Sequence, residues 1–135
     1  MKHYLIDTNV VIDMLVDREG AADACFIIDG AELGEYQLHL CSLSVTNIYY
    51  SLRKQLTREE RIEALKQLCK VIKVIPVDDM VIQNALNSGW KDLEDAVQYC
   101  SAKAIGYIDG IITRNEKDFV RSDIEVIHSS RFIRH

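Results

Sequence analysis

The carboxylate and amide residues that could do chemistry in this sequence fall into three groups that lie far apart along the chain. Each group follows or adjoins an apolar segment, and the members are Asp7, then Asp92, Glu94 and Asp95, then Asn115 and Asp118. Carboxylates that converge repel one another and are costly to desolvate unless a cation binds among them. Oxygen ligands suit hard divalent ions such as Mg²⁺ or Mn²⁺. If the three groups meet in space, they predict a metal site.

The same residues also have structural explanations when each is taken alone. Asp7, Asp92 and Asp95 stand before or at the start of predicted helices, where capping and the helix dipole favour an anion. Asp118 precedes Phe119 and could be a turn residue. The metal hypothesis therefore depends on whether the fold brings the groups together.

Apolar spacing predicts that short strands alternate with helices along nearly the whole chain. The predicted strands are His3–Ile6, Gln37–Cys41, Val71–Val77, Ile108–Thr113 and Ile124–Ile127. Six helices are predicted. The first follows Asn9, the second spans Ala21–Glu32, and the third begins at Ser42 or Ser44. The fourth follows a Thr57–Glu60 capping box, the fifth begins at Asp78, and the sixth spans Leu93–Ile105 and ends before Gly106. This alternation predicts an α/β fold with a central parallel sheet covered on both faces by helices.

A parallel sheet would place the three acidic groups at one edge. Ligands of such folds lie beyond the carboxyl ends of the strands, and these groups follow predicted strands or start a helix there. Asp92 and Asp95 are three residues apart and share one helix face. Among the other acids, Asp13 and Asp17 are expected on the solvated surface, and Asp78 is expected to cap a helix beside Asp79.

Length and composition limit the class of protein. The 135 residues, 48% of them hydrophobic, fit one domain spanning 1–135. A net charge of −5 argues against binding nucleic acid by bulk charge alone, without excluding an enzyme that acts on it. No apolar run approaches the roughly 20 residues of a membrane span. Asp7 and Asp13 interrupt the N-terminal apolar stretch, so no signal peptide is expected.

The four cysteines have no Cys-x-x-Cys spacing. Cys25, Cys41, Cys69 and Cys100 each have apolar neighbours, which predicts reduced core residues in a cytoplasmic protein. A disulfide framework or a zinc site is the alternative. The dispersed histidines form no motif, and the sequence has no glycine-rich phosphate loop.

Three stretches together resemble the motifs of the PIN-domain family, in its VapC-like ribonuclease and toxin branch. They are Leu5-Ile-Asp-Thr-Asn-Val-Val-Ile-Asp-Met-Leu15, Asp92-Leu-Glu-Asp-Ala-Val-Gln-Tyr-Cys-Ser-Ala102 and Ile111-Ile-Thr-Arg-Asn-Glu-Lys-Asp-Phe119. Their order and the length of the chain also resemble the family, so the similarity covers essentially the whole sequence.

The resemblance implies a three-layer α/β/α sandwich and a Mg²⁺- or Mn²⁺-dependent endoribonuclease. By motif, the metal ligands would be Asp7, Asp95 and Asp118, with Asp92 as an auxiliary catalytic acid. The residues that would orient phosphate or water are Thr8, Asn9, Thr113 and Asn115. The resemblance further implies an antitoxin partner and a homodimer.

Two positions depart from the family pattern. Asn47 stands where a glutamate is expected in the helix after the second strand, and Asn115 replaces the first acid of the closing motif. A neutral amide oxygen can still contact a metal but contributes no charge. The rival hypothesis is therefore a PIN-like module that binds RNA or protein with little or no catalysis.

Four cations are candidate contacts to a nucleic-acid backbone. They are Arg53, Lys54, Arg114 and Lys117. Ordinary solvated surface explains each of them equally well.

Overall fold

The computed structural model describes residues 1–132, in which five strands alternate with helices. The elements are β1 (His3–Ile6), α1 (Thr8–Leu15), α2 (Ala21–Glu32), β2 (Gln37–Cys41), α3 (Ser42–Ser51), α4 (Arg58–Val71), β3 (Ile72–Ile75), α5 (Asp79–Leu86), α6 (Leu93–Ile105), β4 (Gly110–Thr113), the 3₁₀ helix η1 (Glu116–Phe119), β5 (Glu125–His128) and the 3₁₀ helix η2 (Ser129–Arg131).

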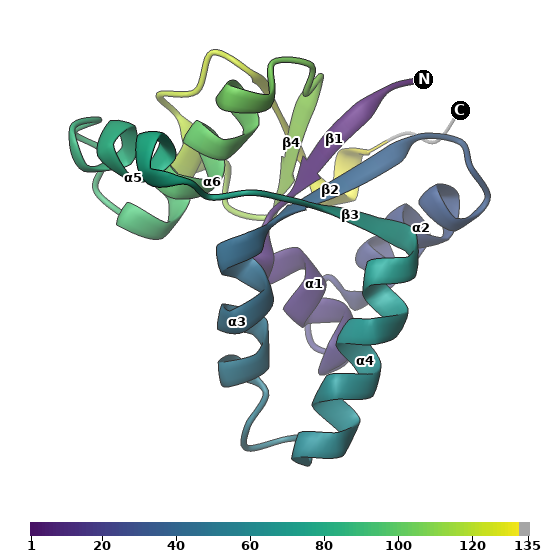
Figure 1. Ribbon diagram of the computed structural model, residues 1–135. Coiled ribbons are helices and arrows are strands. Elements are labelled where there is room, and N and C mark those ends of the chain that lie inside the picture. Colours follow the sequence, from purple (N-terminus) through teal and green to yellow (C-terminus); the bar gives the residue numbers. More distant parts are fainter. Residues whose placement is uncertain (133–135) are drawn as a thin grey trace.

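The strands form one sheet in the order β3-β2-β1-β4-β5, and every neighbouring pair is parallel (Figure 1). The prediction of a parallel sheet is therefore confirmed. From β1 the chain builds outward through β2 and β3, then returns to add β4 and β5 on the other side. The point between β1 and β4 is thus the topological switch point, where open parallel sheets bind ligands at their carboxyl ends.

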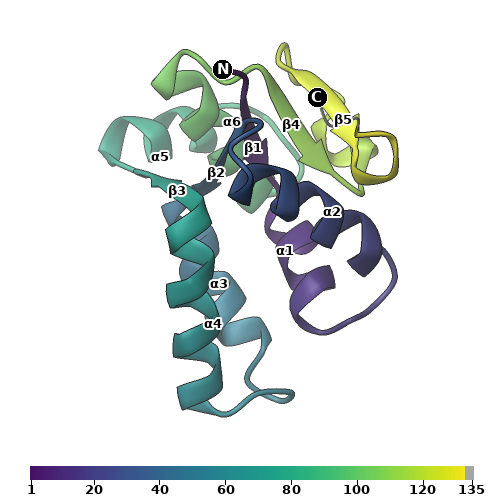
Figure 2. The same cartoon turned by 90° about the vertical axis from the view of Figure 1, so that its right-hand side faces the viewer.

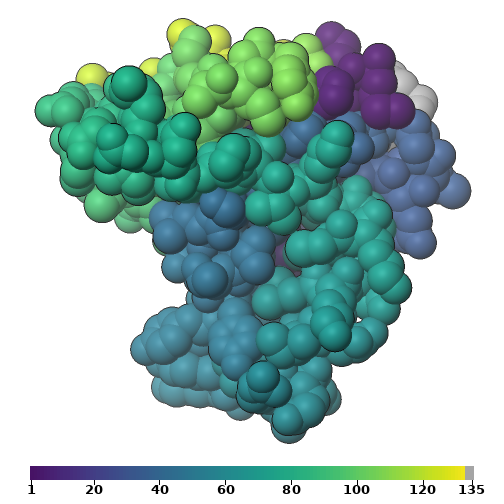
Figure 3. All heavy atoms as spheres, viewed as in Figure 1, coloured from purple at the N-terminus to yellow at the C-terminus, as the bar shows by residue number. Residues whose placement is uncertain are grey.

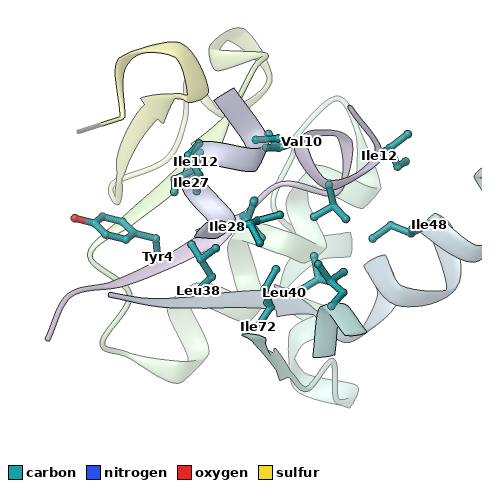
Figure 4. Close-up of a cluster of buried hydrophobic side chains, with 14 of the residues drawn as sticks. Tyr4, Val10, Ile12, Ile27, Ile28, Leu38, Leu40, Ile48, Ile72 and Ile112 are labelled. Carbon is teal, nitrogen blue, oxygen red and sulfur yellow. The ribbon is translucent and has the colours of Figure 1, made fainter. Parts of the chain in front are cut away.

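Helices cover both faces of the sheet, which gives the predicted three-layer α/β/α arrangement (Figure 2). Side chains alternate along each strand, so Tyr4 and Ile6 join one buried cluster while Leu5 joins another. The larger cluster includes side chains of α1, α2, α3 and α4 (Figure 4). The opposite face packs against α5, α6 and η1. Beyond the sheet, α3 and α4 project together as a helical pair (Figures 1 and 3).

Local sequence explains several element ends. At the start of α4, the Glu60 amide donates to Thr57 Oγ1 at 3.1 Å, and the Thr57 amide donates to Glu60 Oε1 at 2.8 Å. This reciprocal pair is the predicted capping box. Asp78 caps α5 by accepting from the Val81 amide, and Gly106 ends α6 with φ +85°.

The strand predicted at Val71–Val77 is shorter in the structure. Helix α4 continues through Val71, and β3 is only Ile72–Ile75. Pro76 has no amide hydrogen for a ladder, so the strand stops before it. A β-branched run suits a buried helix end as well as a strand, which is why the sequence pattern overextended this element.

The two last strands differ from prediction by smaller shifts. β4 begins at Gly110 rather than Ile108, because Asp109 instead bonds with His3 through its own amide and side chain. β5 is Glu125–His128 rather than Ile124–Ile127. For both strands, the apolar pattern of the sequence predicts that a strand is present but not the residue at which it begins.

The cysteines are only partly where they were expected. All four are free, but Cys25 and Cys69 are exposed, while Cys41 is buried and Cys100 is half-buried. Cys25 and Cys69 follow the buried residues Ala24 and Leu68 on outward-facing helix positions, so the prediction that they lie in the core was wrong. Within residues 1–132, none of the helices has the length and apolar character needed to cross a bilayer.

Candidate active site

Asp7 lies at the switch point of the sheet. It follows β1 at the first position beyond the strand, and its amide donates to the Ile112 carbonyl of β4 at 2.9 Å. The residue is only 2% exposed. Gln98 Nε2 donates to Asp7 Oδ1 at 3.1 Å, and Thr113 Oγ1 donates to Oδ2 at 2.9 Å. Two hydrogen bonds from different elements thus fix the carboxylate.

The Asp7 carboxylate is buried without a neutralising partner among the described residues. Burial raises its pKa, the hydrogen bonds from Gln98 and Thr113 oppose that rise, and the charge of Glu94 adds to it. A carboxylate in this position gains stability from any cation that approaches its free side.

Asp95 shows that the three acidic groups converge. Its pKa rises from 3.8 to about 7, first because of burial and then because of the charges of Asp7, Asp92, Asp118 and Glu94. Carboxylates from the end of β1, the start of α6 and η1 therefore act on one another. The predicted convergence of distant groups is a feature of the structure.

Asp92 has a capping role as well. It is the N-cap of α6, and its Oδ1 accepts a hydrogen bond from the Asp95 amide at 3.0 Å. The cap sets the start of the helix, and so it holds the Asp95 backbone in place.

A pocket of about 320 Å³ opens beside these acids. Its lining includes three carboxylates, Asp92, Asp95 and Asp118, and three cations, Lys91, Lys117 and Arg121. Gly89, Trp90 and Val120 complete the wall. A site with both charges can bind a cation at its acidic side and an anion at its basic side.

Three of the expected substrate-orienting residues lie around Asp7. Thr113 is fully buried and its hydroxyl donates to Asp7. The Thr8 hydroxyl donates to Ser44 Oγ at 2.6 Å and lies 3.5 Å from Gln98 Oε1. Asn9 accepts from Arg18 Nη2 at 3.4 Å. These contacts hold the residues in the wall of the site.

The acids fit a divalent cation by charge and donor type. Their side chains offer oxygen ligands, and burial together with the charges of the neighbouring acids raises the pKa of Asp95 to about 7. Across residues 1–132, however, no three His, Cys, Asp or Glu side chains stand close enough to form a finished metal-binding cluster.

The PIN-domain family model matches residues 3–117. The chain belongs to the PIN-domain family. PIN domains are generally divalent-metal-dependent nucleases. None of the curated protein sequences compared with this PIN domain matches it.

Solved structures of low sequence identity share its fold. VapBC-1 from nontypeable Haemophilus influenzae has a TM-score of 0.70 at 18% identity, over 95% of this chain and 98% of that one. A toxin–antitoxin complex from Klebsiella pneumoniae has a TM-score of 0.68 at 21% identity, over 96% and 99%. FitAcB from Neisseria gonorrhoeae has a TM-score of 0.67 at 18% identity, over 96% and 99%.

The two amides that depart from the family pattern lie in different settings of this PIN domain. Asn115 is exposed just after β4, and its backbone N–H donates to Thr113 Oγ1 at 3.0 Å. Two successive hydrogen bonds, both through the Thr113 hydroxyl, therefore link the Asn115 backbone to Asp7. Asn47 is half-buried on α3, and within residues 1–132 no hydrogen bond links it to the acids.

Asp13 is the clearest failure of the sequence analysis, because it was expected on the surface and is only 1% exposed. Its carboxylate accepts from Arg114 through Nε at 2.9 Å and Nη2 at 3.1 Å, and it also pairs with Arg18. Asp17, by contrast, is exposed as predicted. The Asp13 ion pairs tie α1 to the segment that follows β4.

The four cations proposed as nucleic-acid contacts therefore lie in different environments. Arg114 is committed to Asp13, and that contact raises its pKa. Arg53 packs over the Tyr50 ring at 3.8 Å on the α3 side, and Lys54 is exposed next to it. Of these four, Lys117 alone lines the pocket beside the acids.

Gln98 is a site residue that the sequence analysis missed. It is 1% exposed and bridges two segments, since Nε2 donates to Asp7 while Oε1 accepts from the Thr8 amide at 3.3 Å. One signal was available, because Gln98 is three residues beyond Asp95 on the same helix face. Gln98 also follows the apolar residues Ala96 and Val97 in a helix predicted to be buried. A polar side chain in such a position needs a hydrogen-bond partner.

Proposed function

We propose that this PIN domain is a divalent-metal-dependent ribonuclease that hydrolyses phosphodiester bonds of RNA. The observation that carries the proposal is the convergence of carboxylates at the switch point, where burial and then the charges of Asp7, Asp92, Asp118 and Glu94 raise the pKa of Asp95 to about 7. Perturbed titration beside a pocket is typical of functional sites. Membership of a family of nucleases supports the same class of reaction.

In this proposal Asp7, Asp95 and Asp118 hold Mg²⁺ or Mn²⁺. When bound, a divalent cation supplies charge neutralisation at the phosphate and makes a water molecule a better nucleophile near neutral pH. Asp7 is already oriented for this role by Gln98 and Thr113.

Side chains of the protein would accept the proton of the attacking water and bind the phosphate. Asp118 and Asp92 are exposed at the pocket and are suited to orienting the attacking water or accepting its proton. Asn9 and Asn115 are the candidate hydrogen-bonding contacts to phosphate, whereas Thr8 acts through Gln98. In-line attack would leave a 5′-phosphate and a 3′-hydroxyl.

A toxin role, an antitoxin partner, a homodimer and a cytoplasmic location are further parts of the proposal. The toxin role, the antitoxin and the homodimer rest on the resemblance, and a fold neighbour described as a toxin–antitoxin complex supports the first two. The cytoplasmic location rests on the cysteines, which are free. Induced expression tests the toxin role directly. The wild-type chain should arrest growth, while an equally expressed Asp95→Asn variant should not.

Asn47 and Asn115 favour a second candidate, a PIN-like binding module with weak or no catalysis. Each removes a negative charge relative to the family pattern, so the metal would be held less tightly. The retained Asp7, Asp92, Asp95 and Asp118 favour the enzyme, because clustered acids destabilise a fold that has no use for them.

Incubation of the purified protein with total cellular RNA distinguishes the two candidates. We expect cleavage with Mg²⁺ or Mn²⁺, none in EDTA, products with 5′-phosphate ends, and no cleavage by Asp95→Asn. Folded wild-type protein that leaves the RNA intact with both metals would instead establish the binding module.

A further inference from the structure

We propose that the pocket beside the carboxylates is a nucleobase pocket, which takes the base of an unpaired nucleotide next to the scissile phosphate. The inference rests on the proposed function and adds a recognition site to it. It assigns a role to Trp90, Lys91 and Arg121, which the metal chemistry does not use.

Trp90 provides a fixed aromatic surface in this pocket. Its ring stacks on Tyr99 with centroids 4.8 Å apart and 22° between the planes, and it meets the edge of Phe119 at 5.9 Å. Tyr99 is held in turn, since its hydroxyl donates to Asp123 Oδ1 at 2.6 Å. Trp90 is half-buried and still lines the pocket. A rigid aromatic side chain of this kind binds a nucleobase by stacking at little entropic cost.

The cations around Trp90 suit the phosphates that flank a base. Lys91, Lys117 and Arg121 line the pocket, and none of their side chains has a hydrogen-bond or ion-pair partner among residues 1–132. Unpaired lysine and arginine side chains contact phosphate oxygens and fix the register of a strand.

Gly89 lies close to one of these cations. A Cβ built on Gly89 would lie 3.0 Å from Arg121 Nη1, and Gly89 has φ +74°. A larger residue would therefore be strained and would push the guanidinium away. The glycine lets the backbone approach the guanidinium at the mouth of the pocket.

The geometry also limits the substrate. At about 320 Å³ the pocket is in the range of small-ligand sites, so it can enclose a planar base. A base inside a duplex is stacked and paired and cannot enter, whereas an unpaired base can be splayed out of its strand. The acids Asp92, Asp95 and Asp118 on the same wall would place the neighbouring phosphate at the metal.

Trp90 is the one tryptophan of the chain, so its fluorescence reports this pocket alone. The experiment titrates metal-free protein in EDTA, where no cleavage is expected, with a single-stranded RNA octamer. A second octamer has the same phosphates but abasic sites in its central positions, and a third is fully paired. Binding is followed by Trp90 emission and, independently, by anisotropy of labelled RNA.

We expect saturable quenching by the single-stranded octamer and binding about tenfold weaker for the abasic and paired forms. Arg121→Gln and Val120→Glu change exposed pocket residues and should weaken binding of the single-stranded octamer. Lys66→Gln removes an exposed charge on α4 and should not.

Equal binding of the abasic octamer, or RNA binding with unchanged Trp90 emission, would overturn the nucleobase pocket. Metal-dependent cleavage could persist in that case, which separates this failure from a failure of the ribonuclease proposal. Quenching by the base in a protein that does not cleave with either metal would support the pocket while rejecting the enzyme.

Discussion

At Asp95, burial and neighbouring charge act in the same direction on one carboxyl group. Its pKa is about 7 in the folded protein against 3.8 for an unperturbed group. The folded state therefore binds this proton more tightly than the unfolded state. The stabilisation is fully present below pH 3.8 and is lost as the pH rises through 7.

Asp95→Asn should stabilise the metal-free protein at high pH, because it removes the charge that its neighbours repel. We expect a gain of about 2 kcal/mol at pH 8 after screening by solvent, and little change at pH 4. Thermal unfolding at both pH values measures the difference. Asp29→Asn removes an exposed carboxylate of α2 and should show no such pH dependence. Equal behaviour of the two variants would contradict the account of the Asp95 pKa.

Asp13→Ala should destabilise the fold by about 3 kcal/mol, because it leaves Arg114 partly buried without its carboxylate. Urea unfolding provides the free energy. The comparison variant is Glu19→Ala, which removes an exposed partner 3.5 Å from the same arginine and should have a small effect. If the two variants were equally stable, the buried ion pair would not hold α1 to the segment after β4.

Single residues were predictable from the sequence where a motif and a strand end coincided. Asp7 and Asp118 met both conditions, Asp95 was found from its motif at a helix start, and their convergence was predicted. Asp13 and Gln98 could not be assigned in this way, because their roles depend on partners about 90 to 100 positions away in the chain. Spacing along one helix does not reveal which side chain of another element it will meet.

The glycines at the two ends of α2 differ in how much space surrounds them. Gly20 precedes the helix with φ +91°, and a Cβ there would lie 3.0 Å from Asp13 Oδ2 and 3.1 Å from Arg114 Cδ. Gly34 follows the helix with φ +80°, but nothing lies within 4 Å of its Cβ position. Any residue other than glycine would be strained at either position, because both have positive φ. Of the two, only Gly20 also lacks space for a Cβ atom.

Gly20→Ala should therefore cost more stability than Gly34→Ala. We expect about 1 kcal/mol for the left-handed backbone in each variant and at least about 1 kcal/mol more at Gly20 for displacement of the Asp13–Arg114 pair. Chemical denaturation of both variants gives the difference. Equal losses would mean that the ion pair can move aside freely.

Helix α6 brings Asp92, Asp95 and Gln98 to the same site, and Gln98 joins it to β1 and α1. Gln98→Leu should cost about 1–3 kcal/mol, because the Thr8 amide loses an acceptor and Asp7 loses a donor. It should also weaken Mn²⁺ binding, since Asp7 is no longer oriented. Gln67→Leu replaces an exposed glutamine of α4 and should change neither quantity. Intact metal affinity in Gln98→Leu would show that Asp7 needs no second support.

Elements were predicted more reliably than their ends. The capping box at Thr57 and the glycine at 106 are local signals, and both appear in the structure. The boundary between α4 and β3 has no such signal, because the valines and isoleucines around it suit either element. Only Pro76 marks where the strand must stop.

For the molecule as a whole, alternation of strands and helices was enough to predict a parallel sheet between helical layers. The order β3-β2-β1-β4-β5 could not be predicted from the pattern, because spacing along the chain does not say which side of β1 receives a later strand. That order places Asp7 and Thr113 next to each other at the switch point, and so it creates the site.

Calorimetric titration of Mn²⁺ into the metal-free protein tests most directly whether the gathered carboxylates hold a divalent cation. We predict saturable binding at pH 8 that also raises the unfolding temperature, as expected for a ligand of the folded state. Asp95→Asn should lose this binding, and Asp29→Asn should keep it. Folded wild-type protein that binds no Mn²⁺, or binds it as well after Asp95→Asn, would contradict the account.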